Sequence, residues 1–104
     1  MPPGIRRAIQ GHLTQGVDEE VIYKLTTTSW GSDPTAIVVA AHLINDGYRD
    51  VSDIVLSGSP SVSDDVITLP TVKNLAMNSR YRIEVRFTVD GNVLEAHFIV
   101  DGEM

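Results

Sequence analysis

The clearest hydrophobic pattern in the chain is a strict alternation near its C-terminal end. From position 80 to 89, charged or polar residues alternate with apolar or aromatic ones. A period of two predicts a strand with one buried face and one face in solvent. Asp90-Gly91 follows, a dipeptide that favours the two positive φ angles of a tight hairpin turn. We therefore predict a C-terminal β-hairpin whose second strand runs over residues 92–101.

The sequence also predicts the register of this hairpin. A two-residue turn pairs Val89 with Asn92, and every further pair then follows. The pairs on the predicted inner face are all apolar or aromatic: Phe87–Leu94, Val85–Ala96, Ile83–Phe98 and Tyr81–Val100. The outer face has two pairs with favourable charges, Arg86–Glu95 and Glu84–His97. A slip of one residue would exchange the two faces, so we expect a well-defined register.

Leu75 and Tyr81 have the spacing of a known sandwich connection. In immunoglobulin-like and fibronectin type III sandwiches, a Tyr near the start of a strand bonds through its phenol to upstream backbone. Asn78 lies between the two residues and tolerates left-handed backbone well. We therefore predict a tyrosine corner, and we expect structural roles for Leu75, Tyr81, Asp90 and Gly91.

Fainter strand patterns fill the middle of the chain. They cover residues 20–28, 35–44, 51–56 and 65–69, and turn sequences separate them, Pro70-Thr71 among these. Asp33-Pro34 would also suit the start of a helix, but the β-branched run from Ile37 to Val39 favours a strand. Short strands at such regular spacing predict an all-β fold, an immunoglobulin-like antiparallel β-sandwich of about six to seven strands.

Residues 1–17 differ from the rest in composition. Four apolar residues there would share one face of a short helix: Ile5, Ala8, Ile9 and Leu13. A frayed N-terminal arm is the interpretation that we prefer. The alternative is an arm that orders on a neighbouring subunit, with Ile5 and Ile9 as contact residues. We expect residues 18–104 to form one sandwich domain.

Composition and charge narrow the classes of partner. The chain has 104 residues, a net charge of -6 and no cysteine. The negative charge disfavours binding to nucleic acid or to an anionic membrane. The absence of cysteine excludes disulfides, thiolate nucleophiles and Cys-ligated zinc. The longest apolar run, Ala36–Ala41, is too short to span a bilayer, and the first residues lack a secretory signal, so we expect synthesis in a cytoplasm.

The sequence has no constellation typical of catalysis. No two of the three histidines, at positions 12, 42 and 97, have the spacing of metal ligands, and no Ser or Thr lies in a nucleophile motif. The acidic clusters lack the pattern of a calcium loop. We therefore expect no enzyme, no metal and no cofactor. Trp30 is predicted to lie in the core, with a role as an exposed contact residue as the alternative, and Tyr48 is a second candidate contact residue.

Several segments, taken in order, resemble small β-sandwich proteins of tailed-phage virions, some of which are described as fibre-tail adaptors. The similar segments are DEEVIY from position 18, Ser29-Trp30, VSDIVLSG from position 51, and residues 74–103. The family often has Asp before the Trp, and a Thr-Ala-Gly stretch before the Tyr, where this chain has Ser29 and residues 76–78.

The resemblance implies a non-enzymatic structural or adaptor protein of a phage or prophage particle. Such a protein acts through contacts with other virion proteins, with a homo-oligomer also possible. It is made in the cytoplasm of a bacterial host and then becomes part of the virion. The alternative that the sequence leaves open is a ligand- or glycan-binding β-sandwich module. Glycan sites use exposed aromatic side chains beside polar loops, which Trp30 and Tyr48 could supply.

Overall fold

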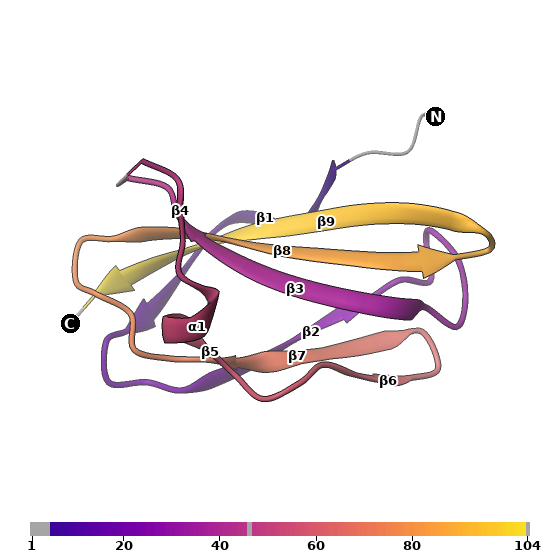
Figure 1. Ribbon diagram of the computed structural model, residues 1–104, viewed down its shortest axis with the longest axis horizontal. Helices are drawn as coiled ribbons and strands as arrows, with labels where there is room; N and C mark the ends of the chain where they lie inside the picture. The colour runs from indigo at the N-terminus through magenta and orange to yellow at the C-terminus, as the bar shows by residue number, and fades with distance from the viewer. Residues whose placement is uncertain (1–4, 46, 104) are drawn as a thin grey trace.

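The chain folds into two β-sheets that face each other, as Figure 1 shows. The computed structural model describes residues 5–45 and 47–103, with side chains from residue 13 onward. One sheet has the order β1-β9-β8-β3-β4, and the other has the order β2-β7-β5, with β6 also paired to β7. The predicted all-β sandwich is confirmed. No helix in the described ranges is long and apolar enough to cross a membrane.

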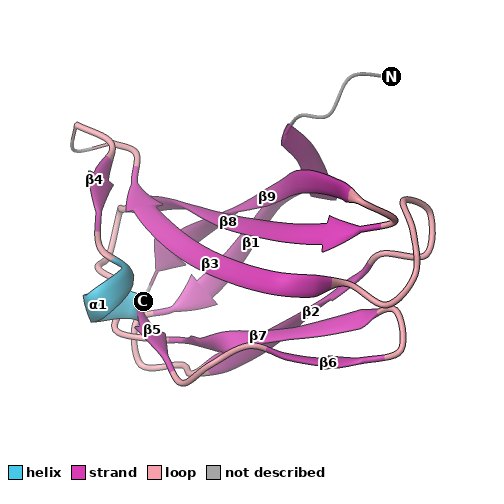
Figure 2. Ribbon diagram, turned by 45° about the vertical axis from the view of Figure 1, so that its right-hand side comes forward, coloured by secondary structure: helices cyan, strands magenta, loops and turns pink. Residues whose placement is uncertain are grey.

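The elements have the following bounds: β1 Ile5–Gly16, β2 Val21–Thr26, β3 Thr35–Leu43, β4 Arg49–Asp50, α1 Ser52–Val55, β5 Leu56–Ser57, β6 Ser61–Ser63, β7 Val66–Val72, β8 Arg80–Val89 and β9 Asn92–Glu103. Figure 2 shows the only helix of the described chain, α1, at one end of the sandwich.

The C-terminal hairpin has the predicted register. Strands β8 and β9 are antiparallel, Val89 pairs with Asn92, and each of the predicted inner and outer pairs is present. The turn between them has φ angles of 48° at Asp90 and 81° at Gly91, as a tight hairpin turn requires. The inner-face residues from Tyr81 to Val89 are all buried. This hairpin forms the centre of the five-stranded sheet.

The core lies between the sheets and has two aromatic contacts at its centre. The rings of Phe87 and Phe98, on neighbouring strands, are 0% and 2% exposed. Trp30 stacks on Phe87 with ring centroids 5.7 Å apart, and Tyr23 packs on Phe98 at 5.2 Å. Such contacts combine a large buried area with a favourable ring geometry. They join the loop before β3 and the strand β2 to the central hairpin.

The predicted tyrosine corner is present before β8. The backbone N–H of Ala76 donates a 2.8 Å hydrogen bond to the phenol oxygen of Tyr81. Leu75 is buried, and Asn78 has a φ of 62°. Gly102 of β9 lies directly against this corner, because a Cβ atom there would overlap the carbonyl oxygen of Ala76. The connection between the two sheets is thus tied to the end of the last strand.

The segment 51–56 is not the predicted strand. Residues 52–55 form the helical turn α1, in which the N–H groups of Ile54 and Val55 donate to the carbonyl oxygen of Val51. Val51 and Val55 are both buried, and they are four residues apart, on one side of the turn. A run with apolar residues at this spacing fits a helix as well as a strand, and the tertiary contacts select the helix.

The prediction of a turn at Pro70-Thr71 is also wrong, because both residues lie inside β7. Proline lacks an amide donor and is tolerated in a strand only where no ladder bond is lost. Pro70 meets this condition because the pairing between β2 and β7 shifts register between Ile22 and Lys24. Neither β6 nor the two-residue strand β4 was predicted from the sequence.

The helix considered for residues 5–13 is wrong as well. Residues 5–16 form β1, which pairs with β9 in parallel, with a register shift between Arg7 and His12. The five-stranded sheet is therefore not wholly antiparallel. The exposed edge of β9 offers backbone partners that a short isolated helix lacks, and short helices are marginal in water. Ile5 and Ile9 belong to β1, but their side chains lie outside the described ones.

Candidate functional site: the outer face of the five-stranded sheet

Charged and polar side chains gather on the outer face of the five-stranded sheet. Alternate residues of β8 and β9 face the core, so the residues between them face outward. The register places Glu84 beside both Ala40 of β3 and His97 of β9, and Arg86 beside both Val38 and Glu95. The outer faces of β8 and β9 thus present carboxylate, guanidinium and imidazole groups on one surface, beside apolar residues of β3.

Glu84 is the centre of a cluster on this face, which consists of one hydrogen bond and the contacts of two nitrogen groups. The Tyr48 hydroxyl donates to Oε2 of Glu84 at 2.7 Å, and Nε of Arg82 lies 2.8 Å from the same oxygen. Nδ1 of His42 lies 3.6 Å from the other carboxylate oxygen. The charge of Glu84 is therefore compensated within the chain, and its carboxylate is held in a fixed orientation.

Tyr48 covers His42, and together they connect the loop after β3 to the sheet. The two rings stack with centroids 4.7 Å apart and an interplanar angle of 20°. Tyr48 has a φ of 55°, an uncommon conformation for an aromatic residue, so its contacts hold the loop in this form. Partial burial, followed by the hydrogen bond to Glu84, raises the pKa of the Tyr48 phenol above its ordinary value. The phenol therefore remains a donor to Glu84 over a wide pH range.

Asp50 fixes the other side of this loop. Its Oδ1 accepts hydrogen bonds from the backbone N–H of Ser52 at 2.9 Å and from the Ser52 hydroxyl at 2.7 Å. The backbone bond, and then the side-chain bond, lower the pKa of Asp50. Oγ of Ser52 in turn accepts a 2.9 Å hydrogen bond from the N–H of Ala41 on β3. Through these bonds, Ser52 occupies the amide of Ala41 on the side of β3 that faces away from β8.

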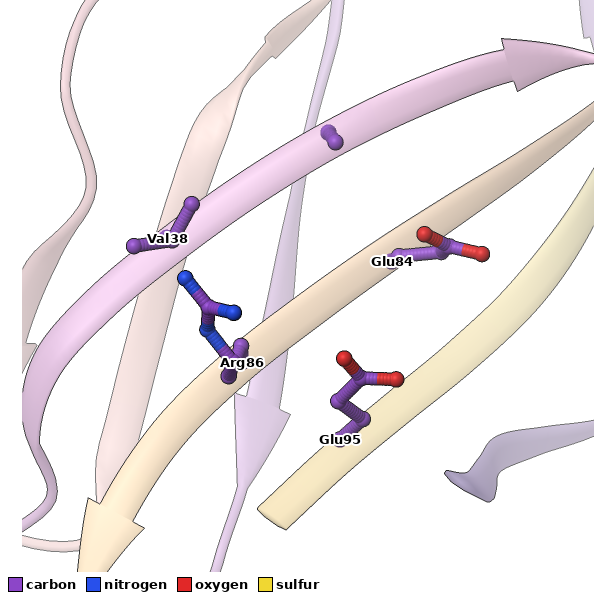
Figure 3. A pocket seen from close by; sticks show the side chains of 5 residues that line it. Val38, Glu84, Arg86 and Glu95 are labelled. Atoms are coloured by element: carbon purple, nitrogen blue, oxygen red, sulfur yellow. The ribbon is translucent and has the colours of Figure 1, made fainter. Parts of the chain in front are cut away.

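A shallow pocket lies beside the cluster. Its volume is about 140 Å³, and Val38, Ala40, Glu84, Arg86 and Glu95 line it. Figure 3 shows the Arg86 guanidinium directed toward Val38 on β3 and not toward Glu95. The predicted register of Arg86 and Glu95 is thus correct, but the two charged ends point to different sides. The pocket has apolar atoms on its β3 side and charged groups from β8 and β9 on its floor.

Strand β3 forms most of one edge of this sheet. The neighbouring strand β4 pairs only with His42 and Leu43. Ala41 is covered by the next segment, since Val51 donates from its N–H to the Ala41 carbonyl at 2.9 Å. The residues before Ala41 pair with β8 on one side only. A stretch of β3 that begins beside the pocket is therefore an open sheet edge.

The two aromatic contact residues predicted from the sequence lie in different places. Trp30 is partly buried and packs against the core through Phe87, as the preferred prediction has it. Its backbone is held by a hydrogen bond to the Thr27 carbonyl at 2.8 Å. Tyr48 is 45% exposed and belongs to the Glu84 cluster. The structure does not bring these two residues together as a shared aromatic platform.

Gln15 is an important residue that the sequence analysis missed. Its side chain is 1% exposed and makes three hydrogen bonds. Nε2 donates to the carbonyls of Val72 at 2.7 Å and Glu19 at 3.1 Å, and Oε1 accepts from the Tyr23 hydroxyl at 2.8 Å. The available signal was its position two residues after Leu13, which puts both on the same face of a strand. That signal is visible only if the segment is read as a strand.

Comparisons with known proteins do not assign this chain to a family. No protein-family model, no curated protein and no solved structure matches it. Within residues 5–45 and 47–103, no group of three or more His, Asp or Glu side chains is arranged to hold a metal ion. The chemistry of the outer face of the five-stranded sheet therefore follows only from the side chains that form it.

Proposed function

We propose that this chain is a non-enzymatic structural or adaptor protein of a phage or prophage particle and that it acts through protein–protein contacts. The observation that carries the proposal is the open edge of β3, beside a face with fixed charged groups. An exposed sheet edge is a ready template for a strand from another chain. The similarity of several segments to small virion sandwiches supplies the context. A role as a ligand- or glycan-binding module remains the alternative.

The composition of purified particles tests this proposal. The chain carries an affinity tag in the bacterium that encodes it, particles are induced and purified, and quantitative mass spectrometry measures the copies per particle. We expect a constant copy number across preparations. Absence of the chain from particles that are otherwise complete would overturn the proposal.

A pair of matched variants tests the surface in the same assay. Val38 and Val93 are both exposed, at 49% and 57%, and both lie on the five-stranded sheet, but only Val38 is on β3. A charged side chain on an edge strand opposes strand addition. We expect Val38→Glu to reduce incorporation at least tenfold and Val93→Glu to leave it unchanged. Equal incorporation of both variants would show that the β3 edge is not the contact surface.

A further inference from the structure

The open part of β3 is short and has defined ends. A register shift interrupts its pairing with β8 between Thr35 and Val38, and Ala36 has a φ of 53°, so the strand bends there. At the other end, Ala41 is closed by Val51 and Ser52. The edge available to a partner is therefore residues 37–40. It accepts a segment of only four or five residues.

Val39 presents the backbone groups of this edge. In an antiparallel pair, the N–H and C=O of alternate residues point to opposite sides of the strand. Both groups of Ala41 point away from β8, because they bond to Ser52 and Val51. Val39, two residues earlier, therefore directs its amide and carbonyl toward the open edge. The half-buried side chains of Ile37 and Val39 lie against the core on the inner face.

Arg86 supplies the charge that selects the partner. It is exposed, and its guanidinium reaches toward Val38 on the outer face. A strand added to β3 would lie two strand spacings from β8, about 10 Å. The extended side chain of Arg86 and a carboxylate side chain of the added strand together span this distance, and they meet over Val38. Glu84, the nearest acid on β8, is already compensated by Arg82 and Tyr48. Glu95 is paired with Arg86 in the register, but the Arg86 guanidinium is turned away from it and toward β3.

We infer that residues 37–40 bind a short extended segment of another protein, with an acidic side chain opposite Val38 that pairs with Arg86. The neighbours of this acid would be apolar and would cover Ile37 and Val39. This inference rests on the proposed function, since it names the partner chemistry for the same edge. Pairing of β3 with β3 of a second copy would not supply this acid, because β3 has no charged residue from Thr35 to Ala41.

Three synthetic peptides test the inference: PTVEVTP, PTVQVTP and PTVKVTP. Each places the central residue on one face and two valines on the other, and the terminal prolines limit self-association. Amide chemical shifts of the ¹⁵N-labelled chain are followed by NMR during titration at low salt. We expect changes centred on residues 37–40 and at Arg86, with the Glu peptide binding at least threefold more tightly than the Lys peptide. The difference should shrink at high salt.

Two charge variants separate a specific pair from a general charge effect. Arg86→Glu should reverse the order, so that the Lys peptide binds more tightly than the Glu peptide. Lys24→Glu makes the same change in net charge on an exposed position of β2, in the other sheet, and should leave the order unchanged. Similar binding of all three peptides, shifts centred on another edge, or reversal by Lys24→Glu would overturn the inference.

The peptide titrations and the particle assay can fail separately, so they test the acidic-segment inference and the proposed function independently. Absence of peptide binding combined with normal incorporation into particles would overturn the acidic-segment inference and leave the proposed function intact. If the chain binds the Glu peptide selectively but is absent from purified particles, the proposed function is overturned and the acidic-segment inference is kept. Concentration-dependent dimerisation through β3 in sedimentation experiments would overturn the choice of partner.

Discussion

At the scale of single residues, the Tyr81 hydroxyl links the start of β8 to the connection that precedes it. Tyr81 is 3% exposed, and its phenol oxygen accepts the N–H of Ala76. This bond is partly buried, so an Ala76 amide that loses its acceptor regains only part of its hydration. The hydroxyl of Tyr48 makes a bond of similar length to Glu84, but in a residue that is 45% exposed. Water can replace the partner there.

Tyr81→Phe should therefore cost more stability than Tyr48→Phe. We expect a loss of about 1–2 kcal/mol for Tyr81→Phe and less than about 0.5 kcal/mol for Tyr48→Phe. Urea unfolding, followed by tryptophan fluorescence of Trp30, measures both free energies. Since the same atom is removed in each variant, equal losses would contradict the assigned role of the tyrosine corner.

At the scale of elements, β1 is attached to the sandwich by more than its pairing with β9. Gln15 extends from β1 into the space between the sheets and bonds to the Val72 carbonyl of β7. It also accepts from Tyr23 of β2, whose ring packs on Phe98 of β9. One side chain thus connects strands of both sheets. Such a fully satisfied polar group favours one arrangement of the strands over others.

Gln15→Leu should loosen β1 although leucine has a similar volume. The carbonyls of Val72 and Glu19 and the Tyr23 hydroxyl would lose their partner, which predicts a loss of about 2 kcal/mol. Hydrogen exchange should become faster in the paired residues 12–16 and 99–103. Thr14→Ala, at the exposed neighbouring position, is the control and should change neither quantity. Unchanged exchange in Gln15→Leu would show that the pairing with β9 alone holds β1.

At the scale of the whole molecule, two tyrosines couple stability to alkaline pH. Burial and then the charge of Glu19 raise the pKa of Tyr23, and burial and then the bond to Glu84 raise the pKa of Tyr48. The folded chain therefore holds these protons more tightly than the unfolded chain does. The resulting stabilisation is complete below the unfolded pKa, about 10, and is lost as the pH rises through the folded pKa values.

The free energy of unfolding should consequently decrease as the pH rises above about 10. In a double variant, Tyr23→Phe with Tyr48→Phe, the decrease should be less steep, whatever its absolute stability at neutral pH. Urea titrations at fixed pH values from 8 to 11 measure the two slopes. An identical slope in the double variant would show that these phenols do not titrate with unfolding.

The C-terminal hairpin and the tyrosine corner could be predicted from the sequence because their determinants are local. The alternation around Phe87 and the Asp90-Gly91 turn together allow one register, and any other would place charged residues in the core. The spacing of Leu75 and Tyr81 is likewise contained within seven residues. Fold class follows from these features together with the regular spacing of the fainter strands, since a half-buried hairpin needs a second layer to cover its apolar face.

Tertiary structure decided what depended on distant partners. Residues 5–16 form a strand because β9 offers an edge, and Gln15 is buried because Val72 and Tyr23 bond to it. Segment 51–56 became α1 because its valines face the core on one side of a turn. The Glu84 cluster and the open edge of β3 follow from strand order, which local periodicity does not encode. Each depends on contacts between separate elements, and only folding brings such elements together.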